Sequence, residues 1–169
     1  QDFVNRGFMV AVVDAPSDQQ GTNGMLGGFR ASAEHAQDIA AAVAYMRSQV
    51  NLPVWLVGTS YGTVSAIKVA DYLADGGGPD GIVLTATLFR RGRIGDSVSD
   101  ADPARIRVPL LLAHHRNDRC AYTPFADAPG FLNRFQGTPA KELLPFEGGG
   151  PVRGGVCDPF DHHGFIGIE

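Results

Sequence analysis

The chain has only two cysteines, no long apolar run and no excess of positive charge. The last two features argue against a membrane-spanning protein and against a nucleic-acid binder. No apolar run approaches the roughly 20 residues that a helix needs to cross a bilayer, so no membrane span is expected. The net charge of -4 does not suit a nucleic-acid binder, which needs a basic face. The two cysteines, Cys120 and Cys157, are compatible with one disulfide or with two buried free thiols.

The length of the chain and its lack of a targeting signal give less information about domain number, oligomeric state and compartment. The 169 residues predict one domain over residues 1–169, with a core large enough to be stable alone, and leave a homo-oligomer open. No signal-peptide pattern is present. Because the chain starts at Gln1 and not at Met, that absence says little about the compartment.

Apolar runs alternate with helix-like segments along the chain. Strands are expected at residues 8–13, 54–57, 81–86, 108–114 and 141–146. Helices are expected from an N-cap at Ser32 to about 50, over 63–75, from an N-cap at Thr123 to about 135, and over 164–169. This alternation predicts an α/β fold with a mostly parallel sheet and helices on both faces.

The most informative motif is the G-x-S-x-G pentapeptide of residues 58–62, which lies between a predicted strand and a predicted helix. In this context a tight turn presents the hydroxyl of Ser60 above the sheet, at a helix N-terminus that favours developing negative charge. Gly58 and Gly62 are expected to leave room where a Cβ would strike the neighbouring strand and helix. Ser60 is therefore a candidate nucleophile.

A serine nucleophile needs a base, and the base needs an acid that holds its tautomer. Asp118 follows the predicted strand at 108–114 through a short loop and is the candidate acid. Asp96, Asp100 and Asp102 have no strand to place them. His163 follows the last predicted strand through a long loop and is the candidate base, with His162 as the rival.

Two further groups of polar side chains lie near Asp118 and His163 in the sequence. His114 and His115 are expected to pack or hydrogen-bond near the acid loop. A metal site built from Asp158, Asp161, His162 and His163 matches no known ligand spacing, so we expect neither a metal nor a cofactor.

The chain resembles the α/β-hydrolase superfamily, in its branch of small esterases and dienelactone-hydrolase-like proteins. The resemblance rests on GTSYG at 58–62, on the strand and RND run ending at Asp118, and on HHGF at 162–165, and it covers nearly the whole chain. It implies Ser60 as nucleophile, Asp118 as acid and His163 as base. Dienelactone hydrolases carry a cysteine where this chain has Ser60.

The chain departs from the superfamily at two points. These folds usually open with further strands, and a loop after one of them supplies half of the oxyanion hole. Here the Tyr61 N–H is the one expected donor, so either an N-terminal piece is missing or another N–H substitutes. There is also no cap domain, because residues 87–107 are too few to form one. The resulting open cleft suits small or soluble esters.

The resemblance also gives the cysteines a meaning. If the three residues assemble, Cys120 and Cys157 lie on neighbouring loops, and a disulfide between them is expected, with a secreted or periplasmic location. The expected function is a serine hydrolase that cleaves carboxylic esters of small molecules through an acyl-enzyme, without a cofactor. The alternatives are a thioesterase or peptidase with the same triad, or a non-catalytic binding protein of this fold.

Overall fold

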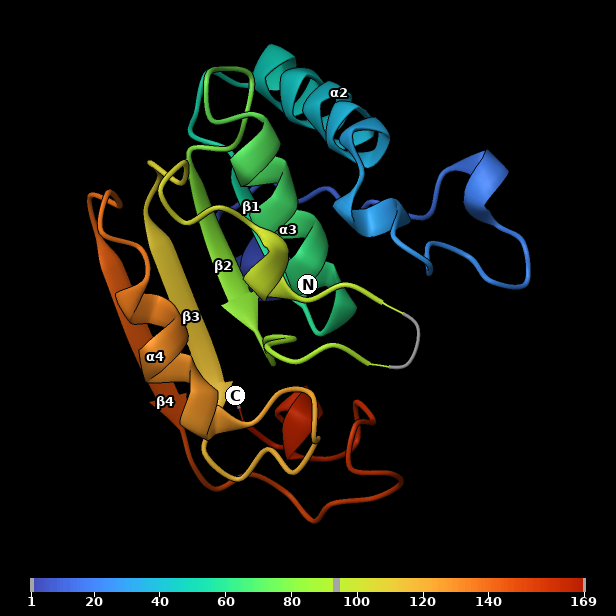
Figure 1. The fold of residues 1–169 in the computed structure, drawn as a ribbon, viewed down its shortest axis with the longest axis vertical. Helices are drawn as coiled ribbons and strands as arrows, with labels where there is room; N and C mark the ends of the chain where they lie inside the picture. Colours follow the sequence, from blue (N-terminus) through green and yellow to red (C-terminus); the bar gives the residue numbers. More distant parts are fainter. Residues whose placement is uncertain (1, 93–94, 169) are drawn as a thin grey trace.

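The computed structural model describes residues 2–92 and 95–168, and in that part of the chain a four-stranded parallel sheet is flanked by helices (Figure 1). The strands are β1 (Trp55–Thr59), β2 (Gly81–Thr85), β3 (Leu110–His115) and β4 (Lys141–Phe146). The α-helices are α1 (Asp2–Asn5), α2 (Ala33–Gln49), α3 (Tyr61–Tyr72) and α4 (Ala128–Asn133). Short 3₁₀ turns occupy Ser17–Gln19, Phe29–Ala31, Val98–Asp100, Phe125–Asp127 and His162–Gly164.

The strands lie in the order β1-β2-β3-β4, and each neighbouring pair is parallel. All four carboxyl ends therefore meet at one edge of the sheet, where open α/β sheets bind ligands. The predicted α/β fold with a parallel sheet is confirmed, and four of the five predicted strands form. The prediction of a single domain over 1–169 stays a prediction.

The main core lies between the sheet and two helices. Ile82 and Leu84 of β2 and Leu110 and Leu112 of β3 point to one face, where they pack against α3 and α4. A second cluster joins α2 to α3, and the predicted N-cap Ser32 accepts a hydrogen bond from the backbone N–H of His35 at the start of α2. The three longer helices thus share one side of the sheet.

The other face of the sheet differs from the expectation of helices on both faces. Trp55 and Val57 of β1 point to this face and are 45% and 54% exposed. Leu144 of β4, on the same face, is also exposed. At the carboxyl edge of this face, Phe165 packs against Phe146. No α-helix of the described residues buries a hydrophobic cluster there.

Two predicted elements are wrong. Residues 8–13 form no strand, and Val12 is 93% exposed, because a strand needs a hydrogen-bonded neighbour and none of the four described strands pairs with this segment. The closing helix predicted over 164–169 is replaced by the 3₁₀ turn at His162–Gly164 and loose turns to 167, and Glu169 lies outside the described residues. No described helix is long and apolar enough to cross a membrane.

Candidate active site

Ser60 occupies the one-residue turn between β1 and α3. Its backbone has φ 51° and ψ −119°, a combination that side-chain-bearing residues rarely adopt. Gly58 makes the turn possible, because a Cβ there would lie 2.3 Å from the carbonyl oxygen of Gly62. The same expectation for Gly62 is wrong, since a Cβ at Gly62 would meet open space.

The backbone N–H of Tyr61 is the first of α3. Helix N-terminal N–H groups have no intrahelical partner, and the helix dipole makes this end favourable for negative charge. The Tyr61 N–H can therefore donate to an oxyanion that forms beside Ser60.

Asp118 and His163 lie together, although 45 residues separate them in the sequence. The Nδ1 of His163 is 3.1 Å from Oδ2 of Asp118, and both side chains are almost fully buried. The other carboxylate oxygen accepts the backbone N–H of Cys120 at 2.9 Å. Asp118 is thus held on both oxygens, while Asp100, one of the rival acids, pairs with Arg91.

Thr123 adds a third group to this pair. Its hydroxyl donates to Oδ2 of Asp118 at 2.8 Å and lies 3.1 Å from Nδ1 of His163. The expectation that Thr123 is a helix N-cap is wrong, because Pro124 occupies the N-cap position of the turn at Phe125–Asp127 and no side chain caps this turn. The Thr-Pro pair is a strong local capping signal, whereas the contact with Asp118 and His163 comes from the tertiary fold.

His162 points away from Asp118. Its ring stacks on that of His115, with centroids 4.4 Å apart and planes within 5° of parallel. His115 is held in turn, because its Nε2 donates to the carbonyl of Gly148 and its Nδ1 accepts the N–H of Asn117. Of the two rival histidines, only His163 meets the candidate acid.

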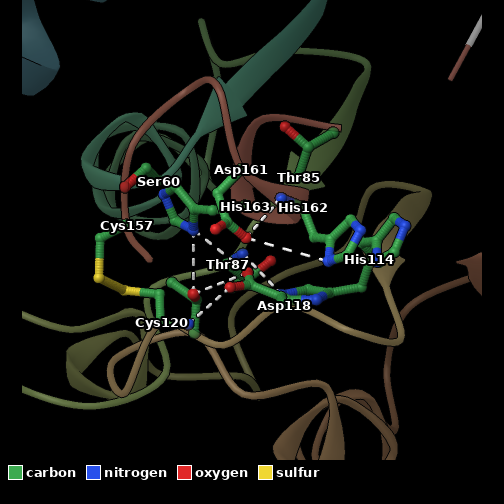
Figure 2. A network of polar contacts seen from close by, with 12 residues as sticks. Ser60, Thr85, Thr87, His114, Asp118, Cys120, Cys157, Asp161, His162 and His163 are labelled. Carbon is green, nitrogen blue, oxygen red and sulfur yellow. Dashed lines mark hydrogen bonds and ion pairs between the residues drawn. A yellow bond between two sulfur atoms is a disulfide. The ribbon is translucent and has the colours of Figure 1, made fainter. Parts of the chain in front are cut away.

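Ser60 is the least connected of the three candidate residues. Figure 2 draws it in the same close-up as His163 and Asp118, and no dashed line reaches it. Among the described residues, no hydrogen bond joins the Ser60 hydroxyl to His163. Catalytic hydrogen bonds are often long in ligand-free structures and tighten when substrate binds.

His114 lies buried beneath the site. Its Nε2 accepts the backbone N–H of Thr87 at 2.9 Å, and its ring stacks on Phe89. Burial lowers the pKa of His114, so the ring is neutral at pH 7. As expected, His114 and His115 serve as packing and hydrogen-bonding residues around the acid loop.

The predicted disulfide is confirmed. Cys120 and Cys157 are bonded, and they close a loop across a sequence separation of 37 (Figure 2). Cys120 lies two residues after Asp118, and Cys157 lies six before His163. The bridge therefore joins the loop of the candidate acid to the loop of the candidate base.

Comparison with known proteins supports the fold. No protein-family model and no curated protein matches the sequence. Among solved structures, an α/β serine hydrolase homologue from Coxiella burnetii superposes with a TM-score of 0.50 at 18% identity, over 68% of this chain and 49% of that one. A zinc-bound cold-adapted esterase from an Arctic intertidal metagenomic library gives 0.50 at 18%, over 69% and 49%. This chain has the α/β-hydrolase fold and spans about half the length of these two structures.

Proposed function

We propose that the chain is a serine hydrolase that cleaves carboxylic esters of small molecules. The observation that carries the proposal is the buried hydrogen bond between Asp118 and His163, which lies at the same sheet edge as the strained turn of Ser60. The superposed serine hydrolase homologue and esterase have the same fold, which supports a hydrolase more generally.

In the proposed reaction, Nε2 of His163 takes the proton of the Ser60 hydroxyl while the serine oxygen attacks the acyl carbon. Asp118 keeps the proton on Nδ1 and stabilises the imidazolium that forms. The Tyr61 N–H donates to the oxyanion. The alcohol leaves with the proton from His163, and a water molecule, activated by the same histidine, then hydrolyses the acyl-enzyme. These steps need no cofactor.

The disulfide supports a secreted or periplasmic location, since disulfides persist in oxidising compartments. One observation favours a second candidate, a non-catalytic binding protein of this fold: the Ser60 hydroxyl has no hydrogen bond to His163. A thioesterase or peptidase would use the same three residues. Rates of hydrolysis measured on a panel of oxygen esters, thioesters and peptides distinguish these activities.

A fluorophosphonate probe tests the nucleophile directly. We expect it to label the protein at Ser60, and we expect Ser60→Ala to lose both labelling and hydrolysis of p-nitrophenyl acetate while its circular dichroism spectrum is unchanged. A Ser60→Ala variant that keeps more than a few per cent of the wild-type kcat would refute the nucleophile. A wild-type protein that neither reacts with the probe nor cleaves any ester would favour the binding protein.

A further inference from the structure

The loop that carries His163 has almost no regular structure of its own. Between the end of β4 and residue 168, its one helical element is the 3₁₀ turn at His162–Gly164. No strand or long helix therefore sets the position of the imidazole. Its position depends on the contacts of the loop, which include backbone hydrogen bonds from Gly150 to Ile166 and from Arg153 to Phe160 and the side-chain contacts of the residues that precede His163.

Three of those contacts reach the loop of Asp118. His162 stacks on His115, Asp161 forms an ion pair with Arg119, and Cys157 is bonded to Cys120. The residues on one side, His115, Arg119 and Cys120, lie within three positions of Asp118 in the sequence. The stack, the ion pair and the disulfide thus hold the two loops together on either side of the Asp118–His163 hydrogen bond.

Asp161 has a double role among these contacts. One carboxylate oxygen accepts the backbone N–H of His162 at 2.6 Å and caps the turn that carries His163. The other accepts Nη2 of Arg119 at 2.5 Å. The carboxylate side chain is fully buried, whereas that of Arg119 is half-exposed. The same group therefore begins the turn of His163 and binds the residue directly after Asp118.

The charge of Asp161 suits this role. The hydrogen bond from Arg119, with further help from the His162 N–H, keeps the pKa of Asp161 below its ordinary value. The carboxylate is therefore ionised at neutral pH. A buried carboxylate that lost its arginine would be an uncompensated charge, which favours a state in which the turn stays beside the acid loop.

We propose that Asp161 is a positioning residue that sets the orientation of His163 toward Asp118 through its ion pair with Arg119. This inference rests on the proposed function for its effect on rate, because it concerns the same three residues. Asp161 contacts neither candidate reacting atom, and it acts through the turn that it caps together with its ion pair to Arg119.

Asp161→Asn is the sharpest test, because an amide keeps the size of the side chain and an oxygen for the His162 N–H but loses the charge that binds Arg119. We expect kcat for p-nitrophenyl acetate to fall about 10²-fold with KM changed less than threefold, since a misplacement near 1 Å costs about that much. Arg119→Gln should lower kcat in the same way, and the double variant should be no worse than Asp161→Asn alone, because both changes remove one interaction.

Asp71→Asn is the matched control. Asp71 is also a buried carboxylate, paired with Lys68 at 2.9 Å and with Arg105 at 3.1 Å, but it lies in the last turn of α3, far along the helix from Ser60. The Asp71→Asn substitution should lower the melting temperature without lowering kcat. The proposal is overturned if Asp161→Asn keeps kcat within threefold, or if both variants lose kcat in proportion to their loss of stability. If Asp161→Asn does not fold, Arg119→Gln decides the matter by the same criterion.

Amide hydrogen exchange separates this proposal from the proposed function. In the Ser60→Ala background, Asp161→Asn should speed amide exchange over residues 162–165 and leave exchange in α3 unchanged. Asp71→Asn should speed exchange in α3 and leave residues 162–165 unchanged. This result is independent of turnover. A wild-type protein without esterase activity would remove the proposed function, whereas unchanged exchange over residues 162–165 in Asp161→Asn would overturn the positioning role.

Discussion

At the residue scale, two adjacent histidines have different surroundings. His163 is buried against Asp118 and Thr123, whereas His162 is partly exposed and stacks on His115. The tight backbone turn at this point separates the two side chains. Gly164 permits the turn, because a Cβ on Gly164 would lie 2.0 Å from the carbonyl oxygen of Pro159. Adjacent residues in this turn therefore have different contacts.

These surroundings predict unequal effects of the two alanine substitutions. His163→Ala should lose about as much esterase activity as Ser60→Ala, because residues of a triad act as a unit. His162→Ala should lose far less, since it removes the stack on His115 and the contact with Asp161 but no member of the candidate triad. The measurement is kcat/KM for a p-nitrophenyl ester. If His162→Ala proved the more damaging of the two, the base would be misassigned by one residue.

At the element scale, the turn from β1 into α3 depends on its first glycine and not on its second. A Cβ on Gly58 would strike the backbone of Gly62 and Thr63, which cannot move without shifting α3. A Cβ on Gly62 would point into open space. The two glycines of one motif therefore have different structural roles.

Alanine substitutions should separate those roles. Gly58→Ala should destabilise the protein by about 1–3 kcal/mol or more, as overpacking against backbone does. Gly62→Ala should be neutral or stabilising by up to about 1 kcal/mol, because alanine loses less conformational entropy in a helix. Urea denaturation of both variants is the measurement. Equal destabilisation of the two would contradict the strand–turn–helix geometry described for this motif.

At the scale of the whole molecule, the Cys120–Cys157 bridge joins the segment after β3 to the segment after β4. The chain-entropy model gives a loop of this size, with a sequence separation of 37, a contribution of roughly 3–4 kcal/mol to stability. The same bridge restrains the loops of Asp118 and His163. Its effect should therefore reach beyond stability.

Reduction with dithiothreitol should lower both the melting temperature and the esterase activity. The activity should fall while the protein is still folded, because the two loops gain freedom around the Asp118–His163 hydrogen bond. The Cys120→Ser/Cys157→Ser double variant is the control, and the reductant should leave it unchanged. A lower melting temperature with full activity would show that the bridge contributes to stability alone.

Much of the fold was predictable from local sequence. The strands β1 to β3 are short, mainly apolar runs bounded by loop residues, and α2 has an N-cap and one apolar stripe, so each could be recognised within a few residues. The segment at 8–13 has an equally apolar sequence and forms no strand. An apolar run shows that a segment could be buried, but burial in a sheet also requires a partner strand.

The parallel α/β fold and the turn at Ser60 could be predicted from sequence, because apolar runs, their order along the chain and the 58–62 motif are local features. The pairing of Cys120 with Cys157 depends on the fold, which brings together two loops 37 positions apart. Tertiary structure alone decided that Thr123 contacts Asp118 and His163, that His162 stacks on His115, and that Asp161 binds Arg119. These contacts join residues 5 to 47 positions apart. The backbone conformation of the loops determines these contacts. Loops have no repeating hydrophobic period, so the sequence gives no pattern from which the direction of a loop side chain could be predicted.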